Sequence, residues 1–322
     1  LGLSALVVAG GYAAGPTLSG VILSFADWPW LFALNVPLGL CSLWLAKRAL
    51  PQDEPRKGSF DVAGALLSIV MLASFFIAMD AVSHAAPIWQ SGGWALLAVL
   101  ACSGFIARQR RAPYPLLPLS VFAEPRFTLA VSASGLAFIG QALTFVALSF
   151  FYQEQMGFSP LETAWLFTPW PLAIMLVGPI AGRLADRINP SILSSTGLGL
   201  LIVGLIALAL VDESTGVAGS LWRTALCGIG FGLFQPPNNR EMMGSLPPER
   251  SANVSGVMST TRTVGQSFGV ALVGAALALG WPVQVTLWLG AATTLLALLA
   301  SIARMPLAKR ALHARRASSA GQ

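Results

Sequence analysis

The sequence predicts an all-α membrane protein, a polytopic bundle of about ten helices that cross a lipid bilayer. The prediction rests on composition, on long apolar runs and on the placement of cations. Hydrophobic residues make up 55% of the 322 residues, charged residues make up 10%, and the mean hydropathy is +0.72. Because a soluble domain usually carries about 25% charged residues, this chain has too little polar surface to cover a water-soluble core.

Ten runs are long and apolar enough to be spans, since a membrane-spanning helix needs about 20 mostly apolar residues. Short links rich in Pro, Asp, Arg and Ser separate the runs, and none of these links is long enough for a soluble domain. The predicted spans are 2–24, 30–47, 61–82, 92–108, 127–151, 162–182, 191–211, 219–237, 252–279 and 283–303.

Cations occur in alternate links. Of the 19 Lys and Arg residues, 17 lie in or beside 48–60, 108–126, 183–190, 238–251 and the C-terminal tail, and the other links have none. Lys and Arg concentrate on the cytoplasmic side of membrane proteins, so these links are predicted to be cytoplasmic. The same asymmetry accounts for the net charge of +6, and nucleic-acid binding is not needed to explain it. The remaining cations, Arg223 and Arg262, fall inside predicted spans.

Cysteine and histidine give no sign of a metal site or a disulfide framework. Cys41, Cys102 and Cys227 are far apart in apolar runs, and His84 and His313 lie in separate links. An odd number of dispersed cysteines favours packing roles. The sequence predicts neither a cofactor nor a bound metal.

Residues 10–20 read GGYAAGPTLSG, an unusual concentration of Gly and Pro within an apolar run. Gly11, Gly15 and Ser19 are spaced by four residues and therefore share one helix face. Small residues on such a face let two helices approach closely in lipid, and Pro16 is expected to bend the helix. On these residues alone, the seam has either a packing role only or a further functional role.

The stretch resembles a motif, Gly-x-x-x-Gly-Pro-x-x-Gly-Gly, on the fifth helix of antiporters of the major facilitator superfamily. Gly11, Gly15, Pro16 and Gly20 match it, and Ser19 replaces one glycine. In that family the kinked seam packs the two halves of the protein together and is associated with antiport. The resemblance implies the same for this segment.

Four further stretches resemble the fourteen-helix drug:proton antiporter branch of the superfamily, and they occur in its order. DWPWLFALNVPLGL and FYQEQMGFSP are similar to two of its patterns. GPIAGRLADRINPS is similar to the cytoplasmic loop motif through Gly182, Asp186 and Arg187, with Asn189 in place of a glycine. ANVSGVMSTTRTVGQSFG resembles the penultimate helix, including Arg262.

The resemblance implies a division of the chain that begins at the family's fifth helix. Two helices (1–50) end the N-terminal bundle, an inserted helix pair with its linkers follows (51–125), six helices form the C-terminal bundle (126–304), and a basic cytoplasmic tail closes the chain (305–322). The implied protein is a monomer in a bacterial inner membrane. It would export small lipophilic, amphipathic drugs or related molecules by alternating access, with the proton as coupling ion, and we expect hydrophobic, cationic substrates.

The sequence leaves two other functions open. A dedicated metabolite transporter of the same superfamily fits the same pattern. A membrane-embedded transferase is disfavoured, because such an enzyme should show acids or His clustered at helix ends, whereas the charges here are scattered singly.

Three residues are candidates for the cavity or for coupling, each with an alternative. Arg262 either reaches toward polar neighbours as a structural residue or takes part in gating or coupling. Gln141 either faces the cavity or bonds a neighbouring helix. Trp165, like Trp170, is either an interfacial anchor or part of a cavity for flat apolar substrates. Asn238 follows Pro236–Pro237 and is predicted to lie in a cap or loop.

Overall fold

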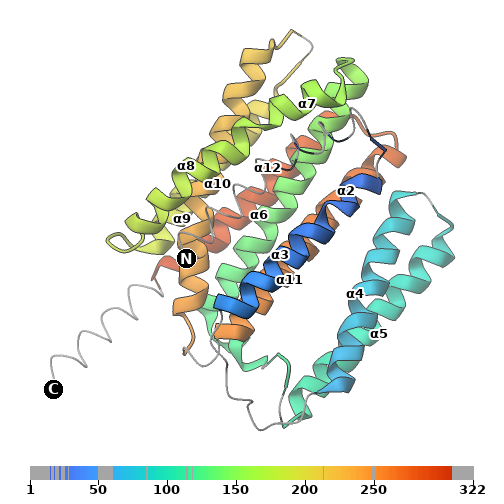
Figure 1. The fold of residues 1–322 in the computed structure, drawn as a ribbon, viewed down its shortest axis with the longest axis vertical. Helices are drawn as coiled ribbons and strands as arrows, with labels where there is room; N and C mark the ends of the chain where they lie inside the picture. Colours follow the sequence, from blue (N-terminus) through green and yellow to red (C-terminus); the bar gives the residue numbers. More distant parts are fainter. Residues whose placement is uncertain are drawn as a thin grey trace.

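The computed structural model describes residues 15, 18, 22, 26–27, 29–49, 61–84, 86–113, 115–117, 119–212, 214–247 and 251–306. The regular elements in this part of the chain are all helical (Figure 1). They are α2 (Pro29–Ala33), α3 (Asn35–Ala49), α4 (Val62–Ser83), α5 (Ile88–Arg111), η1 (Leu119–Ala123), α6 (Pro125–Phe150), η2 (Phe151–Gln155), α7 (Pro160–Phe167), α8 (Pro169–Leu184), α9 (Pro190–Ala209), α10 (Val217–Gly244), α11 (Ser251–Ala278) and α12 (Val283–Ala303).

Eight helical segments in the described residues are long and apolar enough to cross a membrane, and they correspond to eight of the ten predicted spans. They are Pro29–Ala49, Val62–Val82, Ile88–Arg111, Pro125–Gln155, Pro160–Leu184, Pro190–Ala209, Val217–Gly244 and Val283–Ala303. The all-α membrane bundle is confirmed. The predicted span 252–279 is the helix α11, but α11 is not among the eight, and its first half is rich in Ser and Thr. Most of the predicted span 2–24 lies outside the described residues.

Local signals set several helix starts. Ser159 and Glu162 form a reciprocal capping box at the start of α7, and Asn189 accepts a hydrogen bond from the backbone N–H of Ser191 at the start of α9. Both α7 and α9 begin with Pro at the first helical position, where a missing N–H costs nothing. These caps satisfy backbone donors that a helix end leaves without partners.

Helix α6 lies at the centre of the larger bundle, packed against α10, α11 and α12. In Figure 1, α7, α8, α9 and α10 lie on one side of α6 and α12. The main core joins Leu148, Tyr152, Trp170, Leu205 and Phe231. Large aromatic side chains therefore fill the space where α6, α8, α9 and α10 meet.

Two glycines bring α9 and α10 into close contact. A Cβ added to Gly197 would lie 2.5 Å from the backbone nitrogen of Phe234, and one added to Gly230 would lie 2.9 Å from the carbonyl oxygen of Gly197. The two backbones thus touch where neither helix carries a side chain, which is the usual way that membrane helices gain packing contact.

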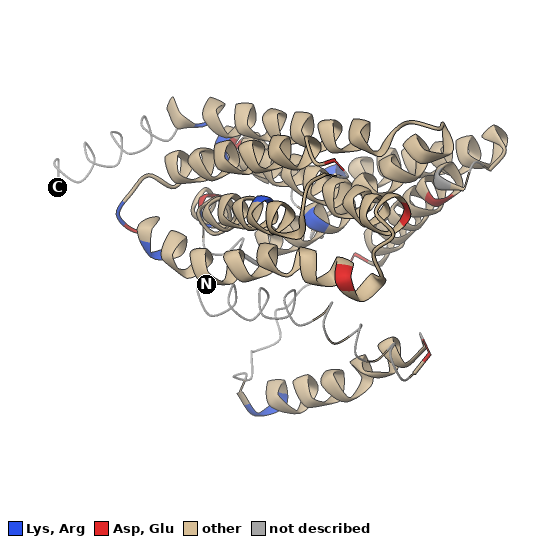
Figure 2. Cartoon of the chain, turned by 90° about the horizontal axis from the view of Figure 1, so that it is seen from above, with Lys and Arg blue, Asp and Glu red and all other residues tan. Residues whose placement is uncertain are grey.

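The α4–α5 pair lies beyond α11, away from the rest of the bundle (Figure 1). Helix α4 contacts α11, and the rings of Phe75 and Phe268 stack there with centroids 6.4 Å apart. Helices α2 and α3 have no buried residues, and Figure 2 shows them apart from the other described helices.

Helix α10 continues through Pro236 and Pro237 to Gly244. The predicted cap or loop at Asn238 is therefore wrong, because Asn238 is a fully buried helix residue. Backbone groups freed by a proline inside a membrane helix are satisfied by neighbouring helices and polar side chains. The Asn238 side chain ties this part of α10 to its neighbours, since it donates to Ala130 of α6 and accepts from Arg304 at the end of α12.

Candidate functional site

A groove runs between α7, α8 and α10, with a volume of about 570 Å³. Trp165, Leu172 and Leu176 line one side, and Ala225 and Ile229 of α10 line the other. Its lining is almost wholly apolar, and Trp165 and Leu176 remain 57% and 67% exposed. Such a surface binds a partner through contact area, at about 25 cal/mol per Å² of buried apolar surface.

Trp165 and Trp170, for which the sequence left the same two alternatives, lie in different environments in the structure. Trp165 lines the groove, whereas Trp170 is only 1% exposed and belongs to the core beneath it. The ring centroids of Trp170 and Phe145 are 4.8 Å apart. Gly228 makes this packing possible, because a Cβ there would lie 2.8 Å from the Cβ of Ala173, on the same helix as Trp170.

The other two candidates lie on different helices from Trp165. Gln141 is half-buried on α6, and Arg262 is half-buried on α11. Neither side chain lines the groove. Within the described residues, Arg262 makes no hydrogen bond and no ion pair, so a role for it in coupling stays a prediction.

The antiporter-type seam falls mostly outside the described residues. Of Gly11, Gly15, Pro16 and Gly20, only Gly15 is described, and it is exposed. A Cβ added to Gly15 would meet no atom within 4 Å. The packing of this seam stays a prediction.

The cytoplasmic loop motif joins α8 to α9. Asp186 forms an ion pair with Arg240 near the end of α10, which ties the loop to that helix. Both side chains are largely exposed, so the pair contributes at most about 1 kcal/mol to stability. Arg187 is exposed, and a Cβ added to Gly182 would meet nothing within 4 Å.

Sequence reasoning missed a buried polar network at the end of the bundle that is predicted to be cytoplasmic. Arg304 follows α12 directly, is 0% exposed, and donates to Asn238 Oδ1 at 2.5 Å and to Ser301 Oγ at 3.0 Å. Arg126 donates through Nε to Glu241 Oε1 at 2.9 Å, which joins the start of α6 to α10. Burial lowers the pKa of Arg304 to about 10. No local pattern reveals this network, because its partners lie far apart in the chain.

A second polar cluster lies where α4 begins and α5 ends. Asp61 caps α4 by accepting the N–H of Gly64 at 3.0 Å, and it also accepts bonds from Arg108 Nε at 3.0 Å and Gln109 Nε2 at 3.1 Å. The bond from the Gly64 N–H is the main cause that lowers the pKa of Asp61. An Asp before an apolar run is a recognised start signal for a helix, so this cap, though not its partners on α5, is readable from sequence.

Charges have an uneven distribution along the helices. In Figure 2, blue ribbon concentrates toward one end of the helices, whereas red ribbon occurs at both ends. The basic end includes the last turn of α3, with Lys47 and Arg48, and the last turns of α5 and α8. This is the arrangement that the alternation of cations in the sequence predicts.

Comparison with known proteins identifies the family of this helical bundle. A family model described as Major Facilitator Superfamily matches residues 1–270. The chain belongs to the Major Facilitator Superfamily. The resemblance that the motifs indicated is thus confirmed at the level of the superfamily, and the fourteen-helix branch stays a prediction.

Three relatives show which kinds of superfamily member are similar in sequence to this chain. The uncharacterized transporter YebQ of Escherichia coli (strain K12) is 39% identical over 275 residues, which is 85% of this chain and 60% of the relative. The multidrug resistance protein Stp of Mycobacterium tuberculosis is 28% identical over 287 residues, with 86% and 52% covered. The riboflavin transporter RibZ of Clostridioides difficile (strain 630) is 25% identical over 278 residues, with 84% and 59% covered.

The chain spans about half to three fifths of the length of these curated relatives. Family membership and the names of the relatives disfavour the membrane-embedded transferase that the sequence left open. Together with the eight span-length helices, they support a multi-pass protein of the cell membrane.

Proposed function

We propose that the full-length protein exports amphipathic small molecules in exchange for protons, by alternating access of a site between two helical bundles. The observation that carries the proposal is the apolar groove between α7, α8 and α10. Its volume of about 570 Å³ lies within the usual range of about 300–1,000 Å³ for small-molecule sites. Relatives named as multidrug resistance proteins support the same function.

The chemistry of the groove favours broad selectivity. Thr168 supplies a hydroxyl to the lining, and that hydroxyl already donates to the carbonyl oxygen of Ala164 at 3.0 Å. With few polar groups to satisfy, the groove imposes little hydrogen-bond geometry on a ligand. A surface that binds through area tolerates many partners, which suits a drug exporter.

Export against a gradient requires a driving ion. One proton charge that moves through 100 mV supplies about 2.3 kcal/mol, which is equivalent to a concentration ratio of about fifty. The described carboxylates lie at or near helix ends or in links, including Asp80, Glu154 and Glu162. None of these described carboxylates is therefore proposed as the proton carrier.

The test is efflux of a lipophilic dye from cells or vesicles that contain the full-length protein, with and without a protonophore. Leu176→Ala removes groove surface and should reduce efflux, while Leu296→Ala removes a comparably exposed leucine from α12 and should not. Efflux that continues unchanged after collapse of the proton gradient would refute proton coupling.

A dedicated metabolite transporter is the second candidate. The relative named as a riboflavin transporter favours it. Transport of one metabolite without transport of any lipophilic dye, in the same vesicles, would replace the multidrug proposal with this one.

A further inference from the structure

Helix α11 carries a polar face within the membrane-spanning bundle. Ser255, Ser259, Arg262 and Gln266 follow one another at spacings of four, three and four residues, so they share one side of the helix. Ser255 and Ser259 are exposed, and Arg262 and Gln266 are half-buried. A polar stripe of this kind is not expected to face lipid, because polar side chains inside the membrane face other protein or a water-filled cavity.

Packing on both flanks holds this face in position. A Cβ added to Gly265 would lie 2.9 Å from the carbonyl oxygen of Gly135, and one added to Gly269 would lie 2.7 Å from that of Ile139. Helix α11 thus meets α6 backbone to backbone. It cannot turn about its axis without driving side chains into α6.

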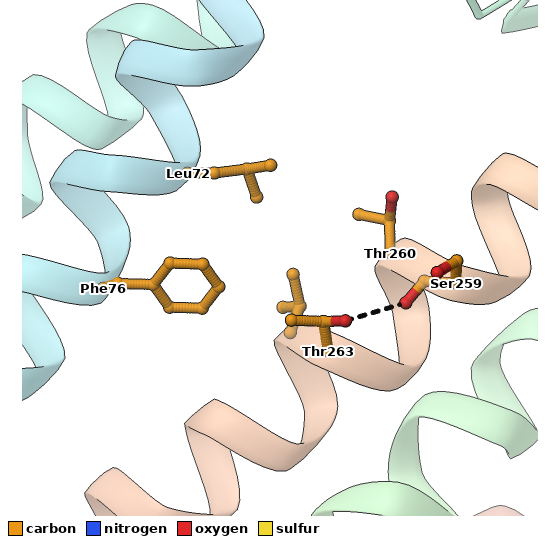
Figure 3. A pocket seen from close by; sticks show the side chains of 6 residues that line it. Leu72, Phe76, Ser259, Thr260 and Thr263 are labelled. Atoms are coloured by element: carbon orange, nitrogen blue, oxygen red, sulfur yellow. Dashed lines mark hydrogen bonds between the residues drawn. The ribbon is translucent and has the colours of Figure 1, made fainter. Parts of the chain in front are cut away.

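On the other flank, α11 faces α4 across a small pocket of about 140 Å³, shown in Figure 3. Leu72 and Phe76 of α4 form its apolar wall, and Ser259, Thr260 and Thr263 form the opposite wall. Thr263 Oγ1 donates to the carbonyl oxygen of Ser259 at 3.1 Å (Figure 3). The polar face therefore lies between the α6 contact and this hydroxyl-lined pocket.

Arg262 lies deep in the bundle. It is about 16 Å from the start of α11, at 1.5 Å per residue. Gly265, one turn further along, is at the level of Phe138, near the middle of the long segment Pro125–Gln155. At this depth a guanidinium needs an anionic or strongly polar partner.

The described part of the chain offers no carboxylate at this depth. The described Asp and Glu residues all lie in links or near helix ends. The nearest described carboxylate along the chain, Glu241, belongs to the basic end of the bundle and is already paired with Arg126. The charge of Arg262 is thus left for a group that comes from elsewhere.

We propose that Arg262, with Ser259 and Gln266 beside it, receives the anionic group of an amphipathic substrate such as an aromatic carboxylate. The proposal rests on the proposed transport function and names its substrate class, and it adds a contact point outside the groove between α7, α8 and α10. A guanidinium presents a planar fork of donors that matches a carboxylate, and the hydroxyl and amide add donors on the same face. Acidic or neutral amphipaths are then favoured over the cationic compounds that the sequence alone led us to expect.

The first experiment measures binding, because binding does not depend on export. Purified full-length protein in detergent is titrated into carboxyfluorescein, an anionic xanthene dye, and rhodamine 123, a cationic one, with fluorescence anisotropy as the readout. The wild type should prefer the anionic dye. Arg262→Gln should weaken its binding by about tenfold, as expected for loss of a hydrogen bond to a charged group, and should leave the cationic dye unaffected.

Two variants serve as controls. Arg262→Lys keeps the charge and should retain most of the preference for the anionic dye, so it tests the proposal even where Arg262→Gln folds poorly. Arg223→Gln removes the other cation inside a span, which donates to the carbonyl oxygen of Gly219 and lies over the ring of Trp222. Arg223→Gln should change the affinity for neither the anionic nor the cationic dye.

The outcomes separate the two proposals. A wild type that binds neither dye or shows no preference, or an Arg262→Gln variant that loses both dyes equally or neither, overturns the anion site. The equal loss would indicate that Arg262 pairs with a carboxylate of the remaining protein. Binding with the expected preference, but without efflux from vesicles under a proton gradient, would refute the transport function and leave the site standing.

Discussion

Arg304 Nη1 donates to Asn238 Oδ1 at 2.5 Å inside the bundle, where both residues are fully buried. Asn238 in turn donates through Nδ2 to the carbonyl oxygen of Ala130 at 3.1 Å. One guanidinium thereby links the ends of α12 and α10 with the start of α6. The excess cationic charge is balanced in part by Glu241, which stabilises the charged form of Arg304 against the effect of burial.

Arg304→Ala should strongly destabilise the protein, because it leaves a buried amide and a serine hydroxyl without their donor. Leaving a buried polar group without its partner costs about 1–3 kcal/mol. The measurement is the thermal unfolding midpoint in detergent. Arg110→Ala, which removes an exposed arginine at the same end of the molecule, is the control and should have little effect. Equal midpoints for Arg304→Ala and the wild type would contradict the structural role of the network.

Gly197→Ala should disrupt the contact between α9 and α10, since its Cβ would lie 2.5 Å from the backbone nitrogen of Phe234. The expected loss is at least about 1–3 kcal/mol, as for other overpacked sites. Gly199→Ala on the same helix meets nothing within 4 Å and should be neutral or slightly stabilising. The measurement is the thermal unfolding midpoint of each variant. Equal midpoints for Gly197→Ala and Gly199→Ala would contradict the prediction.

Gly64→Ala should weaken the polar cluster between the start of α4 and the end of α5. The added Cβ would collide with the Asp61 carboxylate and lie 2.6 Å from Gln109 Nε2. Gly92→Ala on α5 meets nothing within 4 Å and is the matched control. Protease sensitivity of the linker after α5 should rise for Gly64→Ala and not for Gly92→Ala. If both are as resistant as the wild type, the cluster does not hold the linker.

Asp61→Asn should destabilise the protein in a pH-dependent way. The pKa of Asp61 is lowered in the folded state from its ordinary value of 3.8, mainly by the Gly64 N–H. A lowered pKa contributes stability above the unfolded value, and this contribution is lost as the pH falls through the folded value. The difference in unfolding midpoint between wild type and variant should be largest near neutral pH and shrink below about pH 4. A difference in midpoint that grows as the pH falls would contradict a lowered pKa for Asp61.

The orientation of the bundle can be tested by thiol labelling. In a variant that lacks Cys41, Cys102 and Cys227, a membrane-impermeant reagent should label Ser214→Cys on intact cells. Ile188→Cys, an exposed residue between α8 and α9, should be labelled only after the cells are opened. Cations mark the cytoplasmic side of membrane proteins. The reverse pattern would invert the topology.

Most of the fold was predictable from hydrophobic runs alone, because the bilayer requires every span to be long, apolar and helical. Predicted limits such as 283–303 agree with α12, and 162–182 corresponds to α7 and α8 together. The break between α7 and α8 at Thr168 was not predicted, and neither was the π-helical turn Phe151–Gln155. Both are local adjustments of hydrogen bonding that the hydrophobic pattern does not record.

The candidate site was less predictable, because its parts depend on which side of a helix faces a neighbour. The sequence could not tell that Trp165 lines a groove while Trp170, five residues later, is buried. Proline rules likewise predicted an end to α10 before Asn238, and the polar network that supports the continuing helix involves Arg304, 66 residues further on. Pairings across such distances are set by the assembled bundle.

The same network orders events during synthesis of the protein. Asn238 and Ser195 leave the ribosome well before α12, whose Ser301 lies 2.8 Å from the Ser195 hydroxyl. Until α12 and Arg304 are in place, the amide of Asn238 lacks its cationic donor. The final helix therefore acts as a late closing step in assembly, and a nascent chain that stalls before it would present an unsatisfied polar surface to the quality-control proteases of the membrane.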